Sequence, residues 1–368
     1  MINTIDLIDD QKMQVTWDLN RRCNYDCSYC PSFRHDNWSP FPDLDVLTKT
    51  AKFVLDYCNT LVSYKKSGDG VHQRISISFT GGEPTVHPGF LEFAHFINEE
   101  KKKFVGEYAG IALTTNGQFS TIMAKNIVNN FDFATISYHC EALPTQKKKV
   151  LENIKFMHSK GFGLKVNVMF HAEYFDECVE LCLYLDDLEI KYIPRLIGEH
   201  EDSKDSDAHK YTPKQQEWVN EYWGLKGKPK KDKKAREIGR PCCGDRTMET
   251  NDDEKTKFLE HTKFSDWYCS VNWFFLHIDE NTKEIYHHQT CQARFDKTRG
   301  AIGKISEADS ILNNLKNNLE NNTMPIIVCP LGPGAHCGCG MCTPKSIDLF
   351  KFKSIMSQHV DNMQVFNM

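Results

Sequence analysis

Residues 21–31 read RRCNYDCSYCP, and they place three cysteines, Cys23, Cys27 and Cys30, within eight residues. A structural zinc site takes four ligands, and a set of disulfides needs an even number of thiols. Three neighbouring thiols therefore predict a metal centre that keeps one coordination position for a ligand from outside the protein. A zinc site is the competing interpretation. Its nearest fourth thiol along the chain is Cys58, which lies in a helix-like run.

The composition limits the classes of protein that fit. At 368 residues the chain is long enough for a main domain and a smaller one. Its net charge of −5 argues against a general nucleic-acid or membrane-surface binder. The N-terminus lacks the basic and apolar regions of a signal peptide, and no apolar stretch approaches the ~18 residues of a membrane span. We therefore expect a cytoplasmic protein without a membrane partner.

The cysteine content points the same way. The chain has 15 cysteines, an odd number, and disulfides are rare in the cytosol. Clustered cysteines in an intracellular chain more often bind metal. Cys58, Cys178 and Cys182 lie instead in helix-like amphipathic runs, so we expect them to be buried core thiols.

Strand-like and helix-like patterns alternate along residues 13–200. The strand-like segments are 13–19, 74–80, 110–116, 133–139, 164–170 and 189–197, and the amphipathic runs between them are 43–64, 88–103, 120–130, 145–159 and 173–187. This alternation predicts βαβ units and a parallel sheet. Right-handed crossovers in series would form an open barrel or a doubly wound sheet. In both folds the active-site groups gather at the carboxyl ends of the strands.

Short polar motifs lie at these predicted strand ends. The cysteine stretch follows the first strand, and TGGEP (80–84) follows the second. TTNG (114–117) closes the third strand and SYHC (137–140) closes the fourth. We therefore expect one site to be assembled at this edge of the sheet.

The pair of motifs CNYDCSYC and TGGEP resembles the CxxxCxxC and GGE motifs of radical S-adenosylmethionine enzymes, and the resemblance covers residues 13 to about 200. It implies an α/β fold with a partial (β/α)6 TIM-like barrel. It also implies that Cys23, Cys27 and Cys30 hold a 4Fe–4S cluster whose remaining iron binds S-adenosylmethionine.

Further cofactor contacts follow from the same resemblance. Gly81 and Gly82 would let the backbone approach the methionine part of the cofactor, and Glu83 would offer a carboxylate to its ammonium group. An aromatic neighbour of the adenine and polar contacts to the methionine carboxylate and ribose are expected at Tyr29, Asn116, Ser137 and Asn167. His139, Met169 and Arg195 lie near the expected cavity without an assigned role.

The resemblance also implies a reaction. S-adenosylmethionine would be cleaved reductively to a 5′-deoxyadenosyl radical, which abstracts a hydrogen atom from the substrate. The expected reductant is a flavodoxin or a ferredoxin. A non-catalytic iron–sulfur electron carrier is an alternative of another class, but such a protein has no need of the GGE motif.

Cysteines return in the C-terminal third. FLHIDENTKEIYHHQTC (275–291) predicts a β-hairpin that turns at 280–283 and brings Cys291 beside Cys269. The order of a cysteine, a hairpin, a second cysteine and a CxxC pair resembles the twitch domain, the shorter relative of the SPASM domain. It implies one auxiliary 4Fe–4S cluster that carries electrons to or from the substrate, held by Cys269, Cys291, Cys339 and Cys342. Cys329, Cys337 or the Cys242–Cys243 pair could replace one of these ligands or hold a second cluster, and a zinc knuckle is a further alternative.

The predicted domains are a radical S-adenosylmethionine barrel (1–200), a charged linker or excursion (201–240) and a small, cysteine-rich α+β twitch/SPASM-like domain (241–368). Relatives with this domain pair mostly modify peptides or proteins, so we expect a peptide or protein substrate that is modified or oxidised. Oxidation of a small alcohol, or modification of a nucleotide or RNA, are the alternatives. The C–H bond attacked, the direction of auxiliary electron transfer and the oligomeric state stay open.

Overall fold

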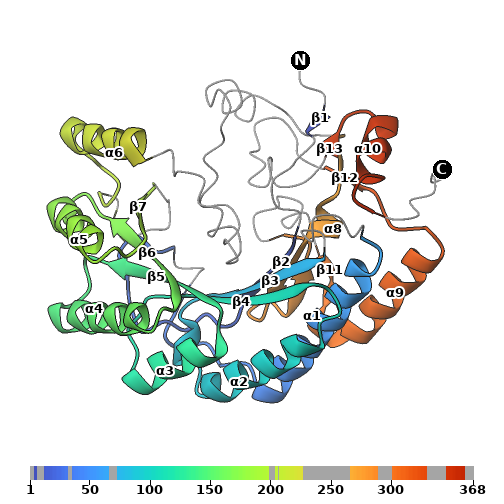
Figure 1. Ribbon diagram of the computed structural model, residues 1–368, viewed down its shortest axis with the longest axis horizontal. Helices are drawn as coiled ribbons and strands as arrows, with labels where there is room; N and C mark the ends of the chain where they lie inside the picture. The colour runs from blue at the N-terminus through green and yellow to red at the C-terminus, as the bar shows by residue number, and fades with distance from the viewer. Residues whose placement is uncertain are drawn as a thin grey trace.

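The computed structural model describes residues 4–5, 12–31, 35–65, 73–198, 204–205, 207–226, 266–288, 301–329 and 345–360. Its main element is a nine-stranded, mostly parallel sheet with the order β11-β10-β9-β2-β3-β4-β5-β6-β7 (Figure 1). Helices cover one side of this sheet, so the chain is a mixed α/β protein, as the sequence predicts.

The six predicted parallel strands are confirmed. They are β2 (Met13–Asp18), β3 (Arg74–Thr80), β4 (Tyr108–Thr115), β5 (Phe133–His139), β6 (Gly163–Phe170) and β7 (Tyr192–Leu196). Each pairs in parallel with the next strand along the chain. A doubly wound sheet reverses its strand order at a switch point. The order here does not reverse, so the sheet has the topology of an open barrel.

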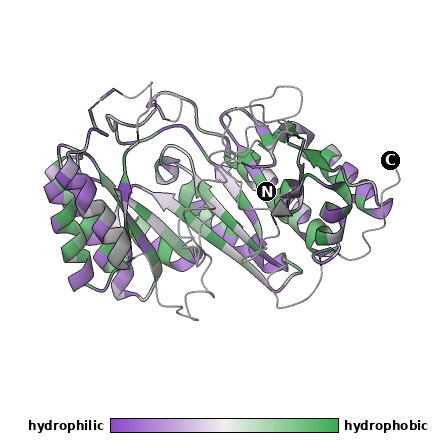
Figure 2. Cartoon of the chain, turned by 90° about the horizontal axis from the view of Figure 1, so that it is seen from above, coloured by the Kyte–Doolittle hydropathy of each residue, from purple (hydrophilic) through white to green (hydrophobic). Residues whose placement is uncertain are grey.

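Five helices connect these strands, close to the predicted limits. They are α1 (Leu44–Val62), α2 (Phe90–Glu100), α3 (Thr121–Asn130), α4 (Pro144–Ser159) and α5 (Phe175–Asp187), with the short 3-10 helices η1 (Pro84–Val86) and η2 (Lys101–Lys103). Ser120 starts α3 by accepting a hydrogen bond from the Met123 N–H, and Pro144 occupies the first position of α4. The helices lie along the convex side of the curved sheet (Figure 1), and hydrophilic and hydrophobic residues alternate around them (Figure 2).

The two faces of the sheet differ in polarity. In β2, Met13, Val15 and Trp17 are at most 1% exposed, and the Trp17 ring packs 5.4 Å from Phe79 and 5.6 Å from Phe93 of α2. Because side chains alternate along a strand, the intervening residues face the concave side. In β2 and β3 these are all polar: Gln14, Thr16, Asp18, Ser76, Ser78 and Thr80. A closed TIM barrel is filled by branched apolar residues, so this concave face is suited to a polar ligand instead.

The C-terminal part of the chain extends the same sheet. β9 (Phe275–Asp279) pairs in parallel with β2, and β10 (Glu284–Tyr286) returns antiparallel to β9. The predicted hairpin with its turn at 280–283 is therefore confirmed. The turn lacks a glycine, and Lys283 takes the left-handed conformation (φ 61°) that glycine adopts most easily. β11 (Ala301–Lys304) completes the edge.

A second, four-stranded sheet joins short segments from both ends of the chain in the order β1-β13-β8-β12. Its strands are β1 (Thr4–Ile5), β13 (Lys345–Ser346), β8 (Tyr268–Cys269) and β12 (Ile327–Val328). Further helices in the described part of the chain are α6 (Pro213–Lys226), α8 (Val271–Phe274), η5 (Ile305–Glu307), α9 (Ala308–Glu320) and α10 (Leu349–Met356). The domain limits at 200 and 240 stay predictions.

None of the helices that the structure describes combines the length and the hydropathy needed to cross a bilayer.

A fully buried lysine lies where α1 meets the C-terminal segment. Lys65 is 2% exposed, bridges to Val360 and holds its ammonium 4.4 Å from the centre of the Phe274 ring. Its Nζ has no hydrogen-bond partner among the residues that the structure describes. Burial lowers the pKa of Lys65 from 10.5 to about 7 because the charged form loses its hydration.

Replacing Lys65 with Met should therefore stabilise the protein. Between pH 7 and 10.5 the unfolded chain binds more protons at this site than the folded chain, so the wild type should gain stability as the pH rises through this window. We expect Lys65→Met to raise the free energy of unfolding at pH 7 by about 2–4 kcal/mol. The variant should also lose the increase in stability that the wild type shows between pH 7 and 10.5. Urea unfolding at several pH values measures both effects. Lys52→Met is the matched control. Lys52 also lies over an aromatic ring, Phe96, but is exposed. Equal effects of the two variants would contradict the prediction.

Candidate functional site

The cysteine stretch is attached to the sheet through the TGGE turn. Beyond the end of β2, the Leu19 N–H donates to the Thr80 carbonyl at 2.8 Å, and the Gly82 and Glu83 N–H groups each donate at 2.7 Å to the carbonyls of Asn20 and Arg22. The pairing of β2 with β3 thus continues beyond the carboxyl ends of the two strands. The segment that leads to Cys23 is therefore held by backbone hydrogen bonds, and the Asn20 side chain adds a hydrogen bond to the Glu83 carbonyl at 3.2 Å.

Both glycines of this turn are required by the chain itself. A Cβ on Gly81 would lie 2.4 Å from the Asn20 carbonyl oxygen, and one on Gly82 would lie 2.2 Å from that of Arg21. Gly81 also has a φ of 129°, which L side chains rarely adopt. The structure therefore gives these glycines a role that the sequence analysis missed. The expected approach to a cofactor stays a prediction.

A second set of contacts joins the two ends of the cysteine loop. The Asp36 N–H donates to the Arg21 carbonyl at 3.0 Å, and the Cys23 N–H donates to the Asp36 carbonyl at 2.9 Å. The Asp36 carboxylate forms an ion pair with Arg21 at 3.6 Å and accepts the Ser39 N–H at 2.9 Å. Cys23 and Asp36, the two ends of the segment called the cysteine loop here, are therefore fixed side by side.

The three thiols of this loop lie close enough to influence one another. Burial raises the pKa of Cys23 to about 11, and the charges of Glu83 and Cys30 add to this effect. Burial also raises the pKa of Cys27, and Cys23 and Cys30 raise it further. The Tyr25 N–H donates to the Cys23 Sγ at 3.4 Å. A bound cation would reverse the mutual repulsion of the thiolates, so these residues suit a metal centre.

The spacing does not suit a single zinc ion. Thiolates around one tetrahedral zinc lie about 3.8 Å apart. In the described part of the chain, the one group of three ligands whose donor atoms all lie within 4.8 Å of one another does not contain the loop cysteines. Cys58, the fourth thiol of the zinc interpretation, is fully buried in α1, where burial raises its pKa to about 12 and Lys65 is its charged neighbour. An iron–sulfur cluster does not require so close an approach, because its thiolates bind different irons.

Glu83 is buried at the centre of the strand ends. One carboxylate oxygen accepts hydrogen bonds from the Thr85 N–H (3.1 Å) and from the hydroxyls of Thr85 (2.6 Å) and Thr115 (2.7 Å). The other accepts the Asn116 N–H at 2.6 Å. Burial raises the pKa of Glu83, and these four donors oppose that rise. The observed role of Glu83 is to join the ends of β3 and β4, while its expected contact with a cofactor stays a prediction.

Asn116 connects the end of β4 to the cysteine loop. Its side-chain amide donates to the Asn24 Oδ1 at 2.6 Å and lies 3.9 Å from the Cys23 Sγ. Asn24 in turn donates to the Gln118 side chain at 3.1 Å. The predicted site residue Asn116 is therefore in contact with a predicted cluster ligand, and Asn24 and Gln118 are partners that no sequence motif revealed.

His139 at the end of β5 is the centre of an aromatic group beside Cys27. Its Nδ1 lies 3.3 Å from the Cys27 Sγ and hydrogen-bonds the Tyr29 hydroxyl. The Tyr29 ring stacks on it at 6.0 Å, and the Tyr25 ring meets it edge-on at 5.4 Å. Burial lowers the pKa of His139 to about 4, so the imidazole is neutral at pH 7. Sequence analysis placed His139 near the cavity but did not find its contact with Cys27.

Ser137 and Asn167 are brought together as directly paired residues of β5 and β6. The Asn167 Oδ1 is buried and accepts no hydrogen bond from any residue that the structure describes. A buried acceptor without a donor costs stability, so this oxygen is suited to a donor from a bound molecule. Both residues are candidates for cofactor contact, as predicted.

Residues distant in sequence support the outer side of the cysteine loop. The Ser28 N–H donates to the Glu141 carboxylate at 2.9 Å, and the Ser28 carbonyl accepts the Asp205 N–H at 3.1 Å. The Asp205 carboxylate contacts the His171 Nε2 at 3.0 Å. Nothing in the sequence around Glu141 or Asp205 signals this role.

Of the four predicted ligands of the auxiliary cluster, the structure describes Cys269. This residue is buried in β8, and its register partner in β12 is Ile327. Cys329, an alternative ligand, follows β12 and donates its N–H to the Trp267 carbonyl at 2.9 Å. Residues two apart on a strand share a face, so Cys269 and Cys329 lie on the same face of this sheet. The other three predicted ligands, Cys291, Cys339 and Cys342, and the alternatives Cys242, Cys243 and Cys337 lie outside the described residues.

Comparisons with known proteins show a shared fold. A structure described as native anSMEcpe with bound AdoMet and Kp18Cys peptide is 14% identical, covers 94% of this chain and 96% of that chain, and has a TM-score of 0.51. Native anSMEcpe with bound AdoMet and Cp18Cys peptide covers 85% and 84%, with 14% identity and a TM-score of 0.51. Streptococcus suis SuiB bound to S-adenosylmethionine covers 84% and 67% at 14% identity, but its TM-score of 0.47 is too low to support a shared fold. The chain matches no protein-family model and no curated protein.

The two glycine contacts predict a large penalty for one added methyl group. We expect Gly82→Ala to lower the free energy of unfolding by about 3 kcal/mol, because its Cβ would collide with two backbone carbonyls. Gly198→Ala is the control: no described atom lies within 4 Å of its Cβ position, so it should change stability by no more than about 1 kcal/mol. Urea unfolding of both variants tests this, and a similar cost at the two positions would disprove the packing account.

Proposed function

We propose that the chain is a radical S-adenosylmethionine enzyme in which Cys23, Cys27 and Cys30 hold a 4Fe–4S cluster with one open iron. The observation that carries this proposal is the loop of three mutually interacting thiols, fixed by the GGE turn at the carboxyl end of a parallel sheet. The fold shared with structures described as containing bound AdoMet supports it.

When bound, the cluster and S-adenosylmethionine supply a 5′-deoxyadenosyl radical able to take a hydrogen atom from an unactivated C–H bond. The chain's own residues prepare the site for it. Asn116 directs its amide toward Cys23, and the neutral His139 lies against Cys27. The rings of Tyr25 and Tyr29 pack around His139 and exclude water from this thiol. Asn167 presents a buried acceptor to a bound donor.

We infer a peptide or protein as the substrate and its modification or oxidation as the reaction. The bound peptides in the anSMEcpe structures support this choice. The polar concave face of β2 and β3 can pair with peptide backbone groups. Oxidation of a small alcohol by the same chemistry is the second candidate. An auxiliary 4Fe–4S cluster that includes Cys269 would carry the electron of the oxidised substrate, and a flavodoxin or ferredoxin would reduce the first cluster.

Cys27→Ala tests the enzyme proposal. After anaerobic reconstitution and dithionite reduction, the wild type should release 5′-deoxyadenosine from S-adenosylmethionine, and its cluster EPR spectrum should change when the cofactor is added. We expect Cys27→Ala to lose both, because the cluster loses one of its three protein ligands. Cys182→Ala, which removes a buried core thiol of α5, should keep both. If the wild type shows the cluster spectrum but releases no nucleoside, the protein is an electron carrier instead.

Cys269→Ala tests the auxiliary cluster separately. Loss of one ligand should lower the iron content of the reconstituted protein by about four atoms per chain, while the EPR change caused by S-adenosylmethionine remains. Cys58→Ala, at a buried thiol of α1, controls for unspecific loss of iron. An unchanged iron content in Cys269→Ala would refute the assignment.

A further inference from the structure

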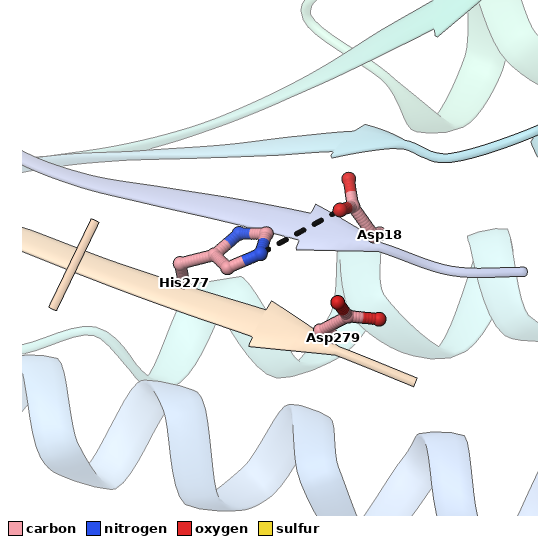
Figure 3. Close-up of side chains that lie close together, drawn as sticks. All are labelled: Asp18, His277 and Asp279. Carbon is pink, nitrogen blue, oxygen red and sulfur yellow. Dashed lines mark ion pairs between the residues drawn. The ribbon is translucent and has the colours of Figure 1, made fainter. Parts of the chain in front are cut away.

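We propose that Asp18, His277 and Asp279 form a binding site for a single divalent transition-metal ion, separate from the iron–sulfur ligands. The site lies where the N-terminal barrel strand β2 meets the C-terminal strand β9. Figure 3 shows the three side chains gathered at the carboxyl ends of these two strands.

The parallel register of β2 and β9 brings these residues together. Asp18 is paired with Asp279, and Thr16 with His277. His277 and Asp279 are two residues apart, so their side chains leave the same face of β9. The donor atoms of all three lie within 4.8 Å of one another. Ligands of a first-row metal lie roughly 3 Å apart in an octahedral sphere, so small rotations of the two carboxylates would close the site.

The hydrogen bond of His277 orients its other nitrogen toward the carboxylates. The Nδ1 lies 3.2 Å from the Thr16 carbonyl oxygen, which can only accept, so the Nδ1 carries the hydrogen. The Nε2 then points toward the Asp18 carboxylate at 3.5 Å. In a neutral imidazole this arrangement sets a lone pair against an oxygen anion, and a cation between the two atoms relieves the repulsion. Metal-binding histidines are typically held by this kind of bond from the second nitrogen to a carbonyl.

The turn after β9 orients the second carboxylate. The Asp279 Oδ1 accepts the N–H groups of Asn281 at 2.9 Å and Thr282 at 3.3 Å. The Glu280 N–H donates to the Asp18 carbonyl at 3.0 Å, so the backbones of the two strand ends are locked together as well. The ligands are thus held by rigid elements, as a metal site of defined geometry requires.

The charges of the three side chains match those of a divalent ion. The His277 side chain is 0% exposed and that of Asp18 is 15% exposed. Two carboxylates bring two negative charges to this position, and a divalent ion bound by them and by a neutral imidazole balances both. The nearby Glu280 carboxylate lies 3.2 Å from the Lys283 ammonium.

The donor set defines the class of ion. One imidazole and two carboxylates suit Mn²⁺, Fe²⁺ or Zn²⁺. Mn²⁺ is the most selective probe because it prefers carboxylate and imidazole ligands to thiolates, which limits its binding to the cysteines of the chain.

The test is Mn²⁺ binding to the full chain, purified anaerobically with its iron–sulfur content intact. We expect one Mn²⁺ per chain by EPR titration, with nitrogen modulation from one histidine in the pulsed spectrum. His277→Gln should abolish the nitrogen modulation and weaken binding at least ~10-fold. His87→Gln is the matched control. His87 is also buried and contacts the carbonyl of Pro42 at 2.8 Å, but it forms no ion pair with a carboxylate of the described residues, so binding should be unchanged.

A second variant distinguishes loss of the metal site from misfolding of the protein. Asp18→Asn keeps the size of the side chain and removes its charge, so it should weaken Mn²⁺ binding while circular dichroism and urea unfolding stay close to those of the wild type. Absence of stoichiometric Mn²⁺ in the wild type would overturn the proposal. So would binding with nitrogen modulation that survives both His277→Gln and Asp18→Asn. The outcome is independent of S-adenosylmethionine cleavage, since none of the measurements uses turnover.

Discussion

The site depends on a contact between two stretches of backbone. Asn20–Arg22 and Gly81–Glu83 approach so closely that a single Cβ on either glycine would enter the van der Waals radius of a carbonyl oxygen. Hydrogen bonds extend the β2–β3 ladder through this contact and beyond the sheet edge. Because these bonds use main-chain atoms, they fix the start of the cysteine loop without engaging its side chains. The three thiols therefore stay available for a metal centre.

Burial of one carboxylate organises the strand ends around that contact. An isolated buried carboxylate would cost several kcal/mol, and four donors from the turn after β3 and from the end of β4 compensate Glu83. Any movement between these strands would leave the charge unsatisfied, so Glu83 couples the position of the GGE turn to that of Asn116. Asn116 then reaches the cysteine loop through Asn24. The hydrogen-bonded series Glu83, Asn116 and Asn24 therefore connects the strand ends to the cysteine loop.

The division of the sheet into an apolar convex face and a polar concave face explains where ligands can bind. Helices cover the convex face, where Trp17 and Phe79 pack against α2. The concave face carries small polar residues in β2 and β3, the Ser137–Asn167 pair in β5 and β6, and His277 and Asp279 in β9. The C-terminal hairpin contributes to this face directly, because β9 is hydrogen-bonded to β2. Two separate donor sets, one of thiols and one of nitrogen and oxygen, thus lie at neighbouring strand ends.

The sequence by itself determined the elements that depend on short-range patterns. The six strands, the helices between them and the 280–283 hairpin follow from periodicity and turn residues. The thiol trio and the GGE turn are recognisable because their residues are neighbours in the chain. Only the tertiary structure decided which distant segments meet: β9 beside β2, His139 against Cys27, Glu141 and Asp205 over the cysteine loop, and Cys329 on the same face as Cys269. Periodicity specifies which face of a strand is buried, but it does not specify its neighbour. The neighbour of a strand is set by the packing of the whole chain, which determines the sheet edges and apolar surfaces that are still exposed and can be covered.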